Sequence, residues 1–139
     1  MTTGYEIPGA LVREHTVPVP LHWDDPGAGT ISVFARELVA PARRDDDLPL
    51  LLFLQGGPGG KSPRPTRGGW VERALREFRV VLLDQRGTGR SSRVTARSIA
   101  RFPDPAAAAR HLLAFRADSI VADAEHLRTT VYGLSLIHI

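Results

Sequence analysis

The chain has 139 residues, of which 42% are hydrophobic and 24% are charged. This length and balance fit one compact globular domain and give no sign of overall disorder. The formal net charge is only +3, and the basic residues, almost all of them arginines, are scattered along the chain. Because a nucleic-acid interface needs a concentrated basic face, we expect no nucleic-acid partner.

The sequence contains no cysteine. This excludes a disulfide framework, a thiolate metal site and a cysteine nucleophile, and it fits a reducing, cytoplasmic location. The first residues do not combine a basic stretch with an apolar run, and the longest apolar run, residues 50–54, is far too short to cross a bilayer. We therefore expect a cytoplasmic protein with no signal peptide and no membrane contact.

Two strands open the predicted fold. Residues 15–21 alternate apolar side chains with prolines at 18 and 20, which suits an edge strand because proline cannot donate to an inner ladder. Residues 31–36 also alternate, and the glycine-containing segment 24–29 between them predicts a turn, so the two strands should form an antiparallel hairpin. The charged segment 41–49 is expected to be a solvated loop, because adjacent aspartates without a spaced partner make a poor metal site.

Two continuous apolar runs, residues 50–54 and 80–83, have the pattern of strands that are buried on both faces. Between them, residues 70–78 place apolar side chains along one face of a helix. Strand, helix and strand in this order predict a βαβ unit and a parallel sheet of the α/β class. Chemistry in such sheets lies on the loops at the carboxyl ends of the strands. Those loops are residues 55–65 and 84–92, and both are rich in glycine.

Two further helices are predicted after the glycine-rich loops. Residues 105–115 are rich in alanine, and residues 116–131 carry apolar side chains along one face. Asp118 or Ser119 is expected to cap the second helix, which should then pack on the sheet. The apolar positions of its face are Ile120, Ala124, Leu127 and Val131.

The loop after the first buried strand ends in Gly60-Lys61-Ser62 and so has the look of a nucleotide-binding loop. The phosphate-binding motif, however, requires an earlier glycine at the position that Gln55 occupies. It also requires a helix that begins at the lysine and serine, so that free N–H groups meet the phosphate. The prolines at 63 and 65 oppose that helix, because a residue before proline is pushed away from helical geometry. We therefore do not expect a nucleotide site.

A second interpretation of this loop is acyl-transfer chemistry. Such chemistry needs two converging backbone N–H donors, held in position, to stabilise the negatively charged oxygen of a tetrahedral intermediate. Gly56 and Gly57 could supply donors at the end of a strand, since glycine lets a substrate carbonyl approach the main chain, and Pro58 would stiffen the turn. An ordinary tight turn is the alternative, and this motif alone does not decide between the two.

Three segments in order carry a more specific resemblance. They are Gly56 to Gly59 after one buried strand, Asp84 to Ser91 after the next, and Asp118 to Glu125 on a predicted helix. Together they resemble the proline iminopeptidases and close α/β-hydrolases over residues 13–131. The resemblance implies the N-terminal portion of an α/β-hydrolase fold, in which a short antiparallel hairpin leads into a parallel sheet flanked by helices. Gln55 departs from the family pattern, where many members carry histidine.

By position, the resemblance implies that a main-chain N–H of Gly56 or Gly57 forms half of the oxyanion hole, with Gly57 as the favoured donor. The loop that begins at Asp84 is expected to brace this region and not to take part in the chemistry, because a buried arginine can hold a carboxylate bidentately and bond loop carbonyls. Its glycines give the turn unusual dihedral angles. The expected scaffold residues are Pro58, Gly59, Asp84, Arg86, Gly87 and Gly89.

The nucleophile of such a hydrolase is missing from the sequence. A serine hydrolase of this fold carries its serine in a Gly-x-Ser-x-Gly turn between a strand and a helix, followed along the chain by an acid and a histidine. The nearest string, residues 133–137, lacks the second glycine, so Ser135 is not expected to be a nucleophile. We expect the nucleophile, acid and base to lie downstream of this chain.

The chain is accordingly divided into residues 1–133, a partial α/β-hydrolase domain that ends before the nucleophile strand, and residues 134–139, a non-native tail. The tail, Leu-Ser-Leu-Ile-His-Ile, resembles the translation of a transposon-end adapter used in preparing DNA sequencing libraries. Without a nucleophile strand, the parallel sheet would have an uncovered edge, which invites aggregation. The chain by itself is therefore predicted to be inactive and poorly soluble.

The intact parent is expected to be a serine aminopeptidase that releases N-terminal proline from peptides without a metal or an organic cofactor. Another α/β-hydrolase, such as an esterase, an epoxide hydrolase or a broader aminopeptidase, is the closest alternative. A downstream aspartate nucleophile would favour the epoxide hydrolase. An alternative of another class is a small, non-catalytic binding or structural protein, which would have to protect the open edge of its sheet.

Overall fold

The computed structural model describes residues 2–56, 59–66, 68–133 and 136–138. Six strands form one sheet in the order β1-β2-β3-β5-β4-β6. The first four in this order pair antiparallel, whereas β5, β4 and β6 run parallel. The strands are β1 (Thr2–Ile7), β2 (Ala10–Pro20), β3 (Thr30–Val39), β4 (Leu50–Leu54), β5 (Arg79–Asp84) and β6 (Leu136–His138). The predicted fold class, an antiparallel hairpin leading into a parallel sheet flanked by helices, is confirmed.

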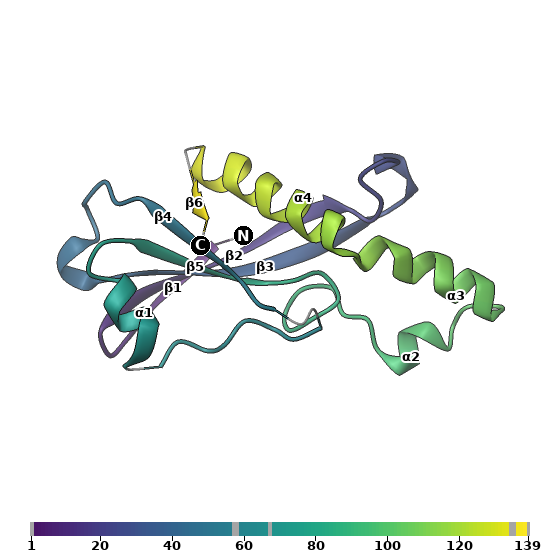
Figure 1. Ribbon diagram of the computed structural model, residues 1–139, viewed down its shortest axis with the longest axis horizontal. Helices are drawn as coiled ribbons and strands as arrows, with labels where there is room; N and C mark the ends of the chain where they lie inside the picture. Colours follow the sequence, from purple (N-terminus) through teal and green to yellow (C-terminus); the bar gives the residue numbers. More distant parts are fainter. Residues whose placement is uncertain (1, 57–58, 67, 134–135, 139) are drawn as a thin grey trace.

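Helices cover both faces of the sheet, with α4 across one face and α1 on the other (Figure 1). The α-helices are α1 (Gly69–Ala74), α2 (Ala96–Ile99), α3 (Pro105–Leu112) and α4 (Ala117–Leu127). Short helical turns are η1 (Pro26–Ala28), η2 (Pro41–Arg43), η3 (Leu113–Phe115) and the π-helical η4 (Arg128–Tyr132). Within the described ranges, no helix is both long enough and apolar enough to span a membrane.

Two apolar cores result from the alternation of side chains along the strands. The core under α4 consists of Val19, Val33, Ala35, Leu50, Leu52, Val81, Leu83, Ala124 and Leu127. The core under α1 consists of Ala10, Val12, Leu38, Leu51, Val71, Leu75, Val80 and Leu82. Successive residues of β4 and β5 therefore enter opposite cores, which explains why their sequences are continuously apolar.

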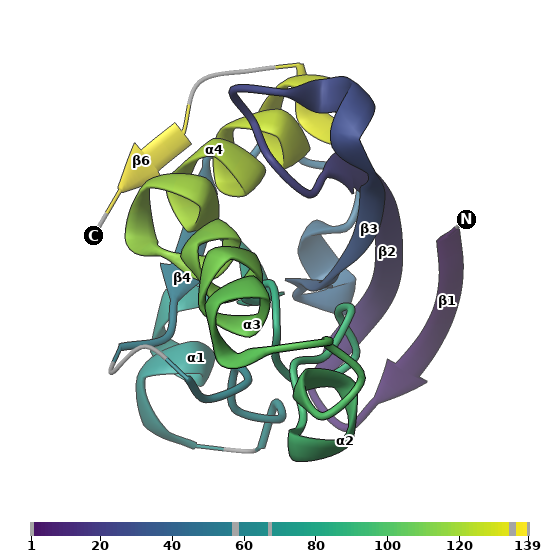
Figure 2. The ribbon, with the colours of Figure 1, turned by 90° about the vertical axis from the view of Figure 1, so that its right-hand side faces the viewer.

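The hairpin strands are longer than the sequence predicts, because β2 begins at Ala10 and β3 reaches Val39. The additional strand β1 pairs with the first half of β2 and forms one edge of the sheet, as Figure 2 shows. Its side chains are mostly exposed, so it carries no apolar alternation that could have revealed it. The helix α2 was likewise not predicted, since it is only four residues long.

The predicted cap of α4 is wrong. The N-cap residue is Arg116, which makes no capping bond with its side chain. Asp118 already lies in the first turn, where it accepts a hydrogen bond of 3.0 Å from the N–H of Ser119 and places its negative charge near the positive end of the helix dipole. The predicted apolar face is correct for Ile120, Ala124 and Leu127, which are buried.

The open edge expected beside β4 is partly paired. Three residues of the tail form β6, which lies parallel to Leu50–Leu52. Such a short strand without a turn signal leaves no pattern in the sequence. Beside it, Phe53 and Leu54 complete β4 and, among the described residues, pair with β5 alone.

Candidate functional site

The two glycine-rich loops meet at the carboxyl ends of β4 and β5, where one carboxylate joins them. The residue that provides it, Asp84, is 2% exposed. Its Oδ1 accepts a hydrogen bond of 2.9 Å from the main-chain N–H of Ser62, and its Oδ2 accepts one of 2.9 Å from the N–H of Arg90. Hydrogen bonds to a charged acceptor are stronger than neutral ones. The path of the first loop is therefore fixed relative to the second.

Side chains add further bonds between the same loops. The hydroxyl of Ser62 donates to the carbonyl of Leu83 at 2.5 Å, and the amide Nε2 of Gln85 donates to the carbonyl of Gln55. The first loop is thus held on both sides of residues 57–58. The other amide atom of Gln85, Oε1, is buried and has no hydrogen-bond partner among the described residues.

Two glycines in the second loop are required by its geometry. Gly89 has a φ of +55°, and a Cβ at this position would lie 2.2 Å from Oδ2 of Asp84. Gly87 has a φ of +87°, and its Cβ would lie 3.0 Å from the ring of Phe115. A larger residue at either position would meet both a strained backbone and a steric conflict.

The buried Arg86 connects the second loop to α4. Its Nε and Nη2 donate to the two carboxylate oxygens of Asp123 at 2.7 and 2.6 Å. Its remaining donors reach the carbonyls of Leu21 and Ala114, both at 2.7 Å, and the carbonyl of Pro20 at 3.0 Å. One guanidinium therefore joins the loop after β5, the end of β2 and the segment before α4.

A second partner completes the surroundings of Asp123, because Trp23 donates its indole N–H to Oδ1 at 2.9 Å. Sequence reasoning did not identify Asp123 as a site residue. Its signal was nevertheless present: an aspartate lies on the apolar face of a helix, between Ile120 and Ala124. A carboxylate in such a place needs a cationic partner, which Arg86 provides.

The serines of the second loop attach it to the antiparallel half of the sheet. Ser91 donates its hydroxyl to the carbonyl of Asp84 at 2.6 Å and accepts a bond of 2.8 Å from the N–H of Phe34. Ser92 accepts one of 3.0 Å from the N–H of Ser32. Both hydroxyls are thus engaged with the main chain, which is the environment of structural serines and not of an activated nucleophile.

The predicted oxyanion-hole residues are only partly described. Gly56 is exposed at the end of β4, whereas Gly57 and Pro58 lie outside the described residues. Gly59, Asp84, Arg86, Gly87 and Gly89, all predicted as scaffold, lie around the junction of the two loops, and Gly59 lines the same hollow as Asp84, Gly87 and Gly89. In the part of the chain that the structure describes, no group of histidine and acidic side chains could hold a metal ion.

Ser135 belongs to residues 133–137, the segment most similar to a nucleophile motif, and it also lies outside the described residues. The buried His15 lies on β2 and binds Oε2 of Glu37 at 2.8 Å, so its ring is engaged by a carboxylate. His111 packs against the rings of Phe102 and Phe115. No hydrogen bond between a serine and a histidine is found among the described residues.

Two curated proteins are similar to this chain, while no protein-family model matches it. A proline iminopeptidase of Aeromonas sobria is 50% identical over 126 residues, which cover 89% of this chain and 29% of the relative. A proline iminopeptidase of Aspergillus aculeatus is 42% identical over 116 residues, which cover 82% of this chain and 26% of the relative. The chain thus spans less than a third of the length of either relative. These similarities confirm the resemblance to the proline iminopeptidase family that the three sequence motifs predict.

Proposed function

We propose that this chain supplies the oxyanion side of a prolyl aminopeptidase, whose nucleophile, acid and base come from residues beyond these 139. The observation that carries the proposal is the carboxylate of Asp84, which accepts main-chain N–H groups from both glycine-rich loops. An oxyanion hole depends on donors that are in place before the reaction begins. A buried carboxylate between the loops provides that preorganisation.

In this proposal each residue has a limited role. The N–H of Gly56 or Gly57 stabilises the oxyanion of the tetrahedral intermediate, and no metal or organic cofactor takes part. Asp84 positions the donor loop through the N–H of Ser62. Arg86 positions the second loop by fixing it to α4 through Asp123.

The substrate class, peptides with an N-terminal proline, is proposed from the names of the two relatives. The serine-peptidase mechanism is proposed from the glycine-rich loops. A cytoplasmic location also belongs to the proposal and is supported by the absence of cysteine from the sequence.

A chimera tests the proposal. Residues 13–131 of this chain would replace the matching segment of the Aeromonas sobria relative, and hydrolysis of proline p-nitroanilide would be compared with that of leucine p-nitroanilide. We expect the chimera to be active and to prefer proline. The 139-residue chain alone should show no hydrolysis and no labelling by a fluorophosphonate probe.

The position of the loop is tested in the same chimera with Asp84→Asn. Because a single oxyanion donor contributes about a hundredfold or more to kcat, we expect kcat to fall by roughly that factor with little change in KM. Asp104→Asn is the matched control, since Asp104 caps α3 with a bond of 2.7 Å to the N–H of Ala107. Equal kcat values for both variants would contradict the positioning role of Asp84.

A further inference from the structure

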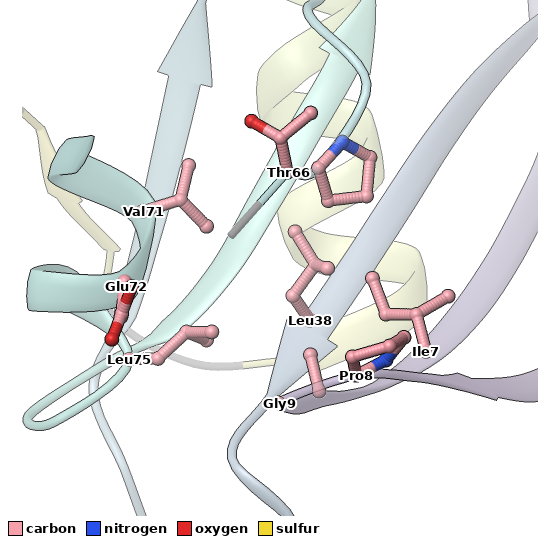
Figure 3. A pocket seen from close by; sticks show the side chains of 10 residues that line it. Ile7, Pro8, Gly9, Leu38, Thr66, Val71, Glu72 and Leu75 are labelled. Carbon is pink, nitrogen blue, oxygen red and sulfur yellow. The ribbon is translucent and has the colours of Figure 1, made fainter. Parts of the chain in front are cut away.

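Three adjoining hollows form one groove on the α1 face of the sheet. The first has a volume of about 160 Å³ and lies between the β1–β2 turn, β3 and α1 (Figure 3). The second, of about 500 Å³, shares Ile7, Pro8 and Pro65 with the first. The third, of about 360 Å³, borders the glycine-rich loops and shares three arginines with the second, Arg36, Arg64 and Arg90. The groove therefore has a mainly apolar end, which the exposed Glu72 also lines, and a cationic end.

The apolar end is built by side chains from three elements. Figure 3 shows Val71 of α1, Leu75 directly after that helix, Leu38 of β3 and Ile7 of β1 around the same hollow. Leu38 is 0% exposed, and Val71 and Leu75 are each 8% exposed, so the wall is part of the core. A dry engineered cavity of about 150 Å³ binds benzene. This end is therefore large enough for a short alkyl chain or one aromatic ring.

Positive charge is in excess at the other end. Its cationic side chains are Arg36, Lys61, Arg64, Arg90 and Arg93. Two carboxylates lie near them. Asp84 is occupied by main-chain N–H groups, and Glu14 pairs with Arg90 at 2.8 Å and with Arg36 at 3.6 Å. Among the described residues, Lys61 and Arg64 form no ion pair.

Two of these arginines are held in place by an aromatic ring. The guanidinium of Arg90 lies 4.1 Å from the ring centroid of Phe34, and that of Arg36 lies 4.9 Å from it. Stacking on a ring reduces the freedom that an arginine loses when it binds an anion. The cationic end is thus partly preorganised.

We propose that this groove binds a small amphipathic anion, a carboxylate or phosphate carrying a short alkyl or aryl chain. The head group would lie among Arg36, Arg64 and Arg90, and the chain would enter the hollow beside Leu38. A neutral apolar ligand would leave the excess charge uncompensated, and a bare inorganic anion would leave the apolar wall in water. The groove borders the proposed peptidase site at Asp84, Gly87 and Gly89, but the arginines and the apolar wall that would bind the anion are not oxyanion donors, so binding can be tested without peptidase activity.

Calorimetric titration tests the proposal on the full chain fused to a solubility partner, with the partner alone as blank. For straight-chain carboxylates from butanoate to octanoate, each added methylene should tighten binding about fourfold until the hollow is full. Octanamide, the neutral analogue, and acetate, which lacks the chain, should each bind at least about tenfold more weakly than octanoate. Octyl phosphate in a parallel titration distinguishes the two head groups. Equal affinity for octanoate and octanamide would overturn the proposal, as would the absence of saturable binding.

A charge-removing variant provides the second readout. Arg64→Gln should weaken octanoate binding by about threefold or more and leave octanamide binding unaffected. Arg64 is an exposed loop residue that lines both the second and the third hollow. Arg110→Gln, an equally conservative change on the exposed surface of α3, is the matched control and should change neither affinity. If both variants weaken octanoate equally, the effect is one of net charge and the groove is not the site.

Discussion

Near each end of β5, a buried carboxylate from a neighbouring element is held by an arginine, but the other partners of these two carboxylates differ. At the carboxyl end, Asp123 receives two bonds from Arg86 and one from Trp23. At the amino end, Glu37 of β3 receives bonds from Arg79 and His15, both at 2.8 Å. Both carboxylates are charged groups inside the fold, where an unpaired charge would be very costly.

The difference lies in which of the partners can lose or gain a proton. Burial alone would raise the pKa of Glu37, but the hydrogen bonds from His15 and Arg79 outweigh it and hold the pKa below its usual value of 4.5. Burial, followed by the nearby carboxylate of Glu37, raises the pKa of Tyr132, whose hydroxyl donates to Oε2 at 3.2 Å. The amino end of β5 therefore carries a titratable cluster, whereas a permanently charged guanidinium supports the loops at the carboxyl end.

The more buried ion pair of the two lies at the candidate site. Arg86 binds three chain segments besides its own, at Asp123, at Ala114 and at the adjacent Pro20 and Leu21, and its side chain is 0% exposed. Catalytic loops need such support because small displacements of an oxyanion donor cost much of its effect. No catalytic donor is proposed at the amino end of β5, so the position of the groups around Glu37 is not constrained in this way.

The largest effect is expected for Arg86→Met. It leaves Asp123 buried without its cationic partner, and removal of one member of a buried pair costs about 3–5 kcal/mol. Urea unfolding followed by circular dichroism should show this loss, or no folded baseline at all. Arg110→Met on the exposed surface of α3 is the control. A loss below about 1 kcal/mol would place Arg86 with ordinary surface arginines.

A smaller effect is expected for Gly89→Ala in the same loop. Its Cβ would lie 2.2 Å from Oδ2 of Asp84, on a backbone with a φ of +55°. We expect a loss of about 3 kcal/mol in unfolding free energy, from overpacking and from the left-handed backbone together. Gly9→Ala isolates the backbone contribution, because Gly9 has a φ of +87° but no atom within 4 Å of its Cβ. Equal losses for the two variants would show that the contact with Asp84 is unimportant.

At the amino end, Glu37→Gln should lower the unfolding free energy by about 2 kcal/mol at neutral pH, since hydrogen bonds to a charged acceptor are lost. A lowered pKa means that the folded chain holds the Glu37 proton less tightly than the unfolded chain. The contribution of Glu37 to the unfolding free energy is therefore complete above about pH 4.5, and it is lost as the pH falls below that value.

The loss from Glu37→Gln should accordingly shrink as the pH is lowered through this range. Urea midpoints measured from neutral to acidic pH test this expectation. Glu77→Gln, which changes an exposed residue in the turn before β5, is the control at neutral pH. A loss that is the same at every pH would mean that the charge of Glu37 does not matter.

These clusters also mark the limit of what the sequence could reveal. The strands β4 and β5 were predictable because residues buried on both faces form unbroken apolar runs. The glycine-rich loops were predictable because they follow those strands. The pairing of Arg86 with Asp123 joins residues that are 37 positions apart, and no local pattern records which carboxylate an arginine will reach. The bond that the N–H of Ser62 donates to Asp84 was missed for the same reason, since a main-chain donor leaves no trace in the sequence.

The smallest effect is expected for Tyr132→Phe, which removes one hydrogen bond to Glu37 and should cost about 1 kcal/mol at neutral pH. Its consequence for alkaline unfolding is more informative. Because the pKa of Tyr132 is raised from 10.0, the stability that its proton provides is full below that value and is lost as the pH rises above it.

The unfolding free energy of the wild-type chain should therefore fall above about pH 10, and Tyr132 should contribute up to about 1.4 kcal/mol per pH unit to this fall. The variant should lack this contribution. Urea unfolding at two alkaline pH values measures the slope. Tyr5→Phe is the matched change at neutral pH, because Tyr5 also donates to a carboxylate, at 3.1 Å to Glu14, but is 44% exposed and should cost less. If Tyr132→Phe leaves the alkaline slope unchanged, ionisation of Tyr132 does not affect the unfolding free energy. The cluster around Glu37 would then be as insensitive to high pH as the pair of Arg86 and Asp123.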